Sequence, residues 1–211
     1  MLLNIEILNR NLTEAKDIYN AFREDYQYLI EAFKRDHDNP IIWRLLIRTG
    51  FTYVESSIFY LQQVITQFDR LNLYSEVRGN VRLSKILQGF ASKPLSVEET
   101  SLVANILYRY NPVERLKKLL KLFTKYFHLE KSTDFSCLEW RLLHEAYLLR
   151  NHLTHPKDRT PLDLDLVTVK GCVEGIGWYV AEFTKLQQLF VIKSKVVIKQ
   201  MAEFVDERKA T

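Results

Sequence analysis

The residues best suited to chemistry in this sequence are a guanidinium, an amide and an imidazole, at Arg150, Asn151 and His155. A guanidinium fits phosphate oxygens and stabilises the negative charge that builds up when a phosphodiester bond breaks. A histidine titrates near neutral pH, so it can take the proton of a ribose 2′-hydroxyl or deliver one to the leaving oxygen. Arg150 also continues an apolar helix stripe, where a charged group needs a carboxylate or a bound anion. These residues predict cleavage of RNA without a metal ion or another cofactor.

One histidine cannot easily serve both ends of that reaction at once. A two-fold homodimer would bring a second Arg150 and His155 alongside the first pair. We therefore expect an isologous homodimer that buries more than about 1,000 Å² in total. The aromatic residues Trp140, Tyr147 and Trp178 are its candidate anchors.

The stretch from Arg150 to Lys157, which reads RNHLTHPK, resembles the R-x(4–6)-H signature of the HEPN domains (higher eukaryotes and prokaryotes nucleotide-binding). The resemblance implies a homodimeric helical bundle with a composite cleft. It also implies an RNase activity typical of toxin, abortive-infection or RNA-processing systems. By the same resemblance Arg150 binds phosphate, His155 is the acid or base, and Asn151 positions the substrate. Lys157 stands where toxins of this family that are paired with an antitoxin often have tyrosine, so an antitoxin or regulatory protein remains an open expectation.

Supporting residues also have ordinary structural explanations. The stretch from Arg48 to Glu55 resembles an earlier helix of the HEPN family, in which an acidic residue faces the motif. Glu55 can orient Arg150, pair with Arg48 or face solvent. His152 fits a surface position, and cations at a helix C-terminus favour the helix dipole whether or not they catalyse anything. The alternative function is a non-catalytic helical module that binds RNA, nucleotide or a partner protein through the same cleft.

Two further patterns concern binding and packing. Lys117, Lys121 and Lys125, together with Lys157, can hold an RNA backbone, although a basic stripe is also typical of a solvated helix face. Gly171 and Gly175 lie on one face of a long predicted helix, where glycine is unfavourable. Their spacing predicts a close crossing with another helix, within the chain or across a dimer.

Composition places the chain among ordinary globular proteins. Hydrophobic residues make up 47% and charged residues 27% of the 211 residues, which argues against disorder. The net charge of +4 permits a nucleic-acid partner without requiring one. Two cysteines are too few for a disulfide framework or a zinc site, and no apolar stretch is long enough for a membrane span. We therefore expect a cytoplasmic protein that has no membrane association.

The elements that must position the motif are all predicted to be helical. Apolar residues recur at helical spacing, glycine and proline are few, and the prolines fall at expected helix boundaries. Asn39 is typical of a helix N-cap, and Ser96 with Glu99 is typical of a capping box. The sequence predicts an all-α, HEPN-like, up-and-down bundle of about five to seven helices. We expect one domain over residues 1–211, with a core at about 13–192 and an amphipathic tail or helix extension at 193–211. The expected helices span about 13–34, 40–72, 83–90, 97–110, 113–127, 135–153 and 162–189.

Overall fold

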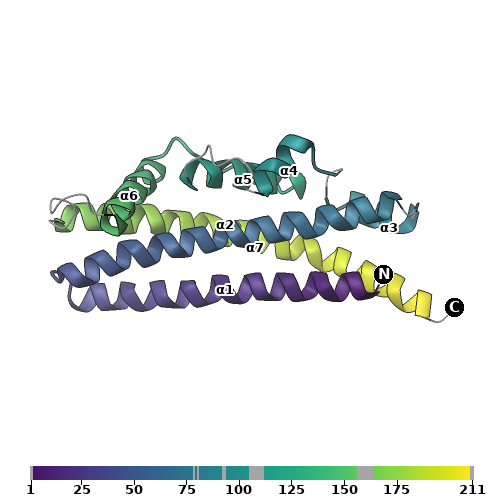
Figure 1. The fold of residues 1–211 in the computed structure, drawn as a ribbon, viewed down its shortest axis with the longest axis horizontal. Coiled ribbons are helices and arrows are strands. Elements are labelled where there is room, and N and C mark those ends of the chain that lie inside the picture. Colours follow the sequence, from purple (N-terminus) through teal and green to yellow (C-terminus); the bar gives the residue numbers. More distant parts are fainter. Residues whose placement is uncertain are drawn as a thin grey trace. The chain divides into compact units, whose positions relative to one another are not determined.

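The computed structural model describes residues 2–77, 79, 81–91, 94–104, 112–155 and 164–209. These residues form seven α-helices, and none of them lies in a β-strand (Figure 1). The all-α fold and the expected number of helices are therefore confirmed. None of the helices in these ranges carries an apolar stretch of the length that a bilayer crossing requires. The helices are α1 (Leu2–Arg35), α2 (Pro40–Val77), α3 (Val81–Gln88), α4 (Val97–Val103), α5 (Pro112–Tyr126), α6 (Leu138–Thr154) and α7 (Leu166–Lys209).

Several helix ends follow their sequence signals, and others do not. The capping box of α4 forms as expected, since the Glu99 N–H donates to Ser96 Oγ at 3.2 Å and the Ser96 N–H donates to Glu99 Oε2 at 3.0 Å. Thr13 was the expected start of the first helix, but α1 already begins at Leu2, because no glycine or proline interrupts the residues before Thr13. The tail continues α7 without a break as far as Lys209. α4 ends at Val103 with its C-cap at Ala104, and residues 105–110, through which this helix was expected to continue, lie outside the described residues. α5 begins at Pro112, one residue before its expected start, and the start expected near residue 162 lies outside the described residues.

The chain folds into two compact units, and α1, α2 and α7 each contribute residues to both. The first unit comprises Met1–Thr13, Leu61–Ser132 and Thr184–Thr211, and the second unit comprises Glu14–Tyr60 and Thr133–Phe183. Each unit has its own core. The single domain expected from the sequence stays a prediction.

In the second unit, α1 and α2 form an antiparallel hairpin. The Asn39 side chain caps α2 by accepting a hydrogen bond from the Ile41 N–H at 3.0 Å, and Trp43 Nε1 donates to the His37 carbonyl at 2.6 Å. Farther from the turn, the Tyr26 ring stacks on Tyr53 with ring centroids 5.9 Å apart. The capped turn therefore sets the register in which the two helices bury their aromatic residues.

A group of buried tyrosines joins this hairpin to α7. The hydroxyls of Tyr19 and Tyr53 lie 2.6 Å apart, and Ser57 on α2 is hydrogen-bonded to Tyr179 on α7. Phe183 packs edge-on against Tyr19 at 5.4 Å. Burial raises the pKa of Tyr19 and of Tyr179, as expected for phenols removed from water. These hydroxyls satisfy one another instead of being left unpaired in the core.

The predicted close helix crossing lies within the second unit, between α6 and α7. A Cβ atom built on Gly175 would lie 2.4 Å from the Leu143 backbone nitrogen and 2.7 Å from the Leu142 carbonyl carbon. At Gly171 it would meet the Leu142 side chain at 3.3 Å, and at Gly177 nothing lies within 4 Å. Only the absence of a side chain at position 175 lets the two backbones approach so closely.

The core of the first unit is a cluster of five phenylalanines. Ring-centroid distances among its contacting pairs lie between 4.8 Å for Phe127–Phe190 and 6.1 Å for Phe68–Phe190. The rings meet at tilted or perpendicular angles, which aromatic pairs prefer to direct face-to-face stacking. Beside the cluster, Asn72 Nδ2 donates to the Tyr126 hydroxyl at 2.9 Å. The cluster members come from α2, α5, α7 and the turns after α3 and α5, and they are Phe68, Phe90, Phe123, Phe127 and Phe190.

Candidate functional site

The residues predicted to carry chemistry lie at the C-terminal end of α6, in the second unit. Arg150 and Asn151 belong to the last turns of the helix, and His155 is its C-cap. The His155 N–H donates to the Asn151 carbonyl at 2.9 Å, and the Thr154 hydroxyl donates to the Arg150 carbonyl at 2.8 Å. These bonds satisfy carbonyls of the final turn and hold the chain close to the helix end.

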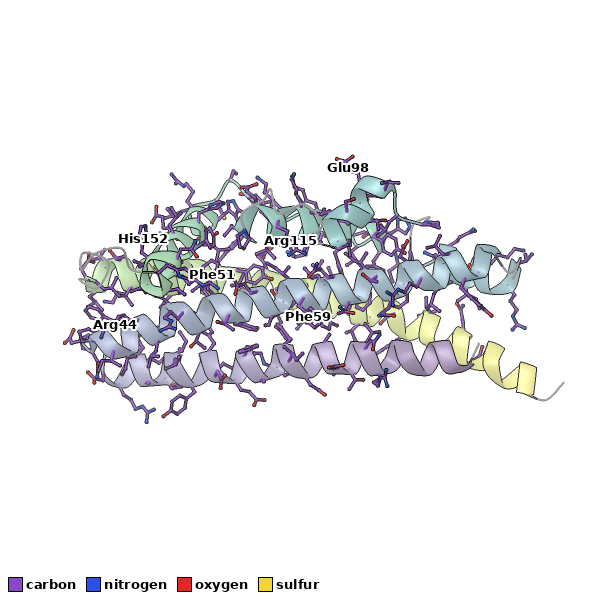
Figure 2. All side chains as sticks on the ribbon, in the orientation of Figure 1. Arg44, Phe51, Phe59, Glu98, Arg115 and His152 are labelled. Atoms are coloured by element: carbon purple, nitrogen blue, oxygen red, sulfur yellow. The ribbon has the colours of Figure 1, made fainter. Side chains whose placement is uncertain are left out.

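Packing against α2 and α7 fixes the position of α6. Trp140, Leu143 and Ala146 form its buried face, and Leu143 lies at the crossing with α7. On the side of α2, the ring of Tyr147 packs against Phe51 with centroids 5.6 Å apart, and Phe51 is marked in Figure 2. Because 147 and 51 each lie about one turn before the charged residues, this contact positions α6 beside α2 where Arg150 meets Glu55.

Arg150 is held by the carboxylate of Glu55. Its Nη2 lies 2.8 Å from both Oε1 and Oε2 of Glu55, and the two side chains are 23% and 34% exposed. Of the possibilities for Glu55, the structure therefore supports pairing with Arg150. Arg48, the other candidate partner, is exposed, and no ion pair joins it to Glu55 among the described residues.

Asn151 belongs to the same polar group. Arg150 Nη1 donates to Asn151 Oδ1 at 3.1 Å, so the guanidinium is bound on one side by a carboxylate and on the other by an amide. Burial between α2 and α6 raises the pKa of Glu55, and the neighbouring Arg150 offsets part of this shift. Since Arg150 bonds both carboxylate oxygens, its guanidinium has little freedom to turn.

The two histidines of α6 and the histidine at its C-cap differ in their surroundings. His144 contacts the Trp140 ring with centroids 5.5 Å apart. His152 and His155 are both exposed, and His152 is marked in Figure 2. In the part of the chain that the structure describes, no hydrogen bond or ion pair joins His155 to Arg150. The structure thus brings Arg150, Asn151 and Glu55 together and leaves His155 at the solvent-exposed helix end.

The predicted RNA-binding lysines belong to the first unit, on α5. Lys125 Nζ forms an ion pair with Glu99 Oε1 at 3.0 Å. Lys121 is exposed and Lys117 is half-buried, and both have interactions of their own. Lys157 lies outside the described residues. The lysines of α5 and the motif of α6 therefore belong to different units.

The sequence did not predict the Phe51–Tyr147 ring contact that positions the Arg150–Glu55 ion pair. Phe51 and Tyr147 have the ordinary appearance of core residues, and the only available signal was their similar spacing from Glu55 and Arg150.

Within the described ranges, no group of three or more His, Cys, Asp or Glu side chains is arranged to hold a metal ion. No protein-family model, curated protein or solved structure matches this chain.

Proposed function

We propose that the chain is a HEPN-like endoribonuclease that cleaves RNA without a metal ion, with Arg150, Asn151 and His155 at its reaction centre. The observation that carries the proposal is the pair of hydrogen bonds from Arg150 to Glu55, at 2.8 Å each. A guanidinium held in place needs no reorganisation when negative charge develops on a phosphate, which makes it an effective electrostatic catalyst. The exposed part of Arg150 is where the phosphate would bind.

In the proposed reaction, the ribose 2′-oxygen attacks phosphorus and the bond to the 5′-oxygen breaks. His155 accepts the 2′-hydroxyl proton, or donates a proton to the 5′-oxygen, and its exposed position leaves it accessible to RNA. The products are a 2′,3′-cyclic phosphate and a free 5′-hydroxyl. Arg150 stabilises the charge on the non-bridging oxygens, and Asn151 positions the substrate.

The second proton-transfer group would come from a second copy of the chain. We propose an isologous homodimer in which both copies of Arg150 and His155 open into one cleft. Trp140 is buried, so this residue is a poor interface anchor, contrary to our expectation from the sequence. Leu148 on α6 is 56% exposed and suits that role better. The proposal includes a cytoplasmic location, RNA as substrate, a toxin, abortive-infection or RNA-processing role, and an antitoxin or regulatory protein as a further partner.

The second candidate function is a non-catalytic module that binds RNA, nucleotide or a protein at the same helix end. One observation favours it. Both terminal nitrogens of the Arg150 guanidinium are already engaged, Nη2 by Glu55 and Nη1 by Asn151. A residue bound in this way can serve as a fixed positive charge for binding without taking part in a reaction.

A cleavage assay separates the two functions. Purified native protein and the Arg150→Ala, His155→Ala and His152→Ala variants are incubated with structured RNA in EDTA, and the RNA ends are analysed. We expect cyclic phosphate ends from the native protein and from His152→Ala, and a loss of at least about 100-fold in the other two variants, the usual contribution of an acid–base group. RNA binding without cleavage by the native protein would favour the binding module. Equal cleavage by all four proteins would place the activity elsewhere.

A further inference from the structure

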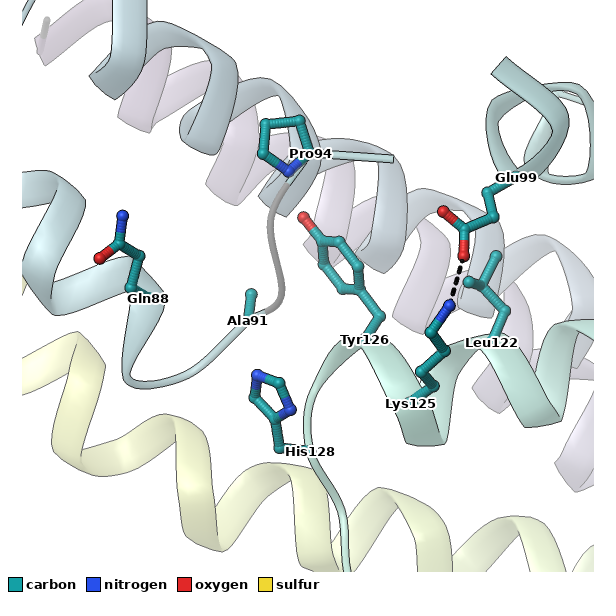
Figure 3. A pocket seen from close by; sticks show the side chains of 8 residues that line it. All are labelled: Gln88, Ala91, Pro94, Glu99, Leu122, Lys125, Tyr126 and His128. Atoms are coloured by element: carbon teal, nitrogen blue, oxygen red, sulfur yellow. Dashed lines mark hydrogen bonds and ion pairs between the residues drawn. The ribbon is translucent and has the colours of Figure 1, made fainter. Parts of the chain in front are cut away.

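The first unit contains a cavity of about 550 Å³ that the sequence analysis did not anticipate (Figure 3). It lies where α3, α4 and α5 end or begin, so its walls come from several short segments. Its volume is within the range of about 300–1,000 Å³ that is common for small-molecule sites. All of its lining residues belong to the first unit, and none of them is among the residues proposed for the RNase centre in the second unit.

One part of the cavity wall is apolar and rigidly held. Ala91, Leu122 and Tyr126 are all buried, and Pro94 completes this surface. The Tyr126 ring cannot turn freely, because its hydroxyl accepts a hydrogen bond from Asn72 at 2.9 Å. This wall suits a flat or branched hydrocarbon group, and its fixed side chains reduce the entropy lost on binding.

The remainder of the wall is polar and contains the Lys125–Glu99 ion pair and the His128 side chain. Lys125 and His128 are both exposed at the cavity, and Glu99 accepts hydrogen bonds from Lys125 and from the Ser96 N–H. The Glu99 carboxylate is thus engaged through both oxygens. A ligand group near these residues meets an ammonium and an imidazole, while the fixed negative charge of Glu99 opposes a doubly charged anion.

His128 adopts a backbone conformation that usually favours glycine. Its φ is 47°, in the left-handed region that non-glycine residues seldom adopt. Lys193 holds this turn by donating to the carbonyls of Phe127 at 2.9 Å and His128 at 3.1 Å. The conformation is that of a helix C-cap, in which the His128 N–H donates to the Lys125 carbonyl at 3.2 Å and the Leu129 N–H donates to the Thr124 carbonyl at 2.9 Å. This cap of α5 places His128 at the cavity.

We propose that this cavity binds a small organic carboxylate with an aromatic or branched apolar body. The apolar body contacts Leu122, Pro94 and Tyr126, and the carboxylate lies between Lys125 and His128. A carboxylate fits better than a phosphate ester because it carries a single negative charge beside Glu99. Hydrogen bonds to ionised groups are the stronger class, so the carboxylate supplies much of the binding energy.

The probe for this site is 4-fluorobenzoate. Its binding is detected as broadening of its ¹⁹F signal when the full chain is added. Its uncharged counterpart 4-fluorobenzamide and the small anion trifluoroacetate each lack one half of the proposed ligand. We expect both to bind at least about tenfold more weakly than 4-fluorobenzoate, the effect of losing one charge-assisted contact or the apolar contact. Equal binding of the benzamide would overturn the carboxylate assignment, as would tighter binding of phenyl phosphate used as a competitor.

Variants localise the binding. Lys125→Met should weaken 4-fluorobenzoate binding about tenfold, and His128→Gly should weaken it several-fold while keeping the turn. Lys121→Met is the matched control, because Lys121 lies on the same helix without lining the cavity. Thermal melting checks that each variant is folded. Absence of broadening with the native protein, or equal losses in Lys125→Met and Lys121→Met, would overturn the proposal.

Discussion

Glu55 in the second unit and Glu99 in the first are each paired with a basic side chain at a similar distance. Glu55 lies 2.8 Å from Arg150, and Glu99 lies 3.0 Å from Lys125. The pKa of Glu55 is nevertheless raised and that of Glu99 lowered. The two carboxylates have similar exposure, 34% and 28%, so exposure alone does not explain the difference.

The surroundings of each carboxylate explain the opposite shifts. Glu55 lies between the packed helices α2 and α6, and removal from water disfavours its charged form more than Arg150 favours it. Glu99 lies in the first turn of α4, where the Ser96 N–H donates to it and the helix dipole favours a negative charge. An ion pair alone therefore does not determine the ionisation of a carboxylate. Burial between packed helices outweighs the counter-ion at Glu55, whereas the backbone hydrogen bond from Ser96 acts in the same direction as the counter-ion at Glu99.

The largest expected effect comes from the helix crossing that positions Arg150. Gly175→Ala should destabilise the protein by about 3 kcal/mol, because the new methyl group meets the backbone of Leu143 and Leu142. Gly177→Ala is the matched control and should stabilise by about 1 kcal/mol, since it meets no atom and alanine favours the helix. Urea unfolding measures both changes. Similar stability of the two variants would show that the crossing has room for a side chain.

Breaking the two ion pairs should give a smaller and unequal effect. Arg150→Met should cost about 1–2 kcal/mol of unfolding free energy, because it leaves the half-buried Glu55 carboxylate without a partner. The loss is no larger because the Glu55 side chain is 34% exposed and water still reaches its carboxylate. Lys125→Met should cost less than about 1 kcal/mol, because the Lys125 side chain is 74% exposed. Urea unfolding is again the measurement, with Arg48→Met as a control expected within about 0.5 kcal/mol of the native protein. Equal losses for Arg150→Met and Lys125→Met would contradict the difference between the two regions.

The smallest expected effect is in the pH dependence of stability, where the two carboxylates should act with opposite signs. Glu55 has a raised pKa, so its contribution is fully present below its ordinary value of 4.5 and is lost as the pH rises through the folded-state value. Glu99 has a lowered pKa, so its contribution is present above 4.5 and is lost as the pH falls through the folded-state value. The measurement is the free energy of unfolding of the native protein minus that of each variant, plotted against pH. The difference curves for Glu55→Gln and Glu99→Gln should slope in opposite directions. Parallel slopes would remove the distinction.

Local signals in the sequence predicted much of the fold. The capping box at Ser96 and Glu99 and the cap at Asn39 depend on residues close in the chain, and both form. Gly175 was recognisable because glycine is unfavourable inside a helix unless another backbone approaches it. Thr13 misled us for the same local reason: a residue that often caps helices stands inside α1. Local preference identifies possible boundaries, and the surrounding chain decides which of them are used.

The candidate site was predictable only in part. The motif residues follow one another on α6, but the choice among partners for Glu55 required the packing of α2 against α6, across 95 positions of sequence. The cavity of the first unit was not predictable, because its walls come from segments that are separately unremarkable in sequence. The left-handed conformation of His128 belongs to the C-terminal cap of α5, where the Leu129 N–H donates to the Thr124 carbonyl at 2.9 Å, and the residue type does not signal it because glycine is usual at that position.

The interleaving of the two units has a consequence for biosynthesis. The last segment of the second unit ends at Phe183, whereas the phenylalanine cluster of the first unit needs Phe190 from a later segment. At ordinary elongation rates, a ribosome takes several seconds to translate from Phe127 to Phe190. During that interval the four earlier rings have no fifth ring to close their core, and apolar surface exposed in this way is what chaperones bind and what drives aggregation. The first unit is thus begun early in translation and completed only after the second has been fully synthesised.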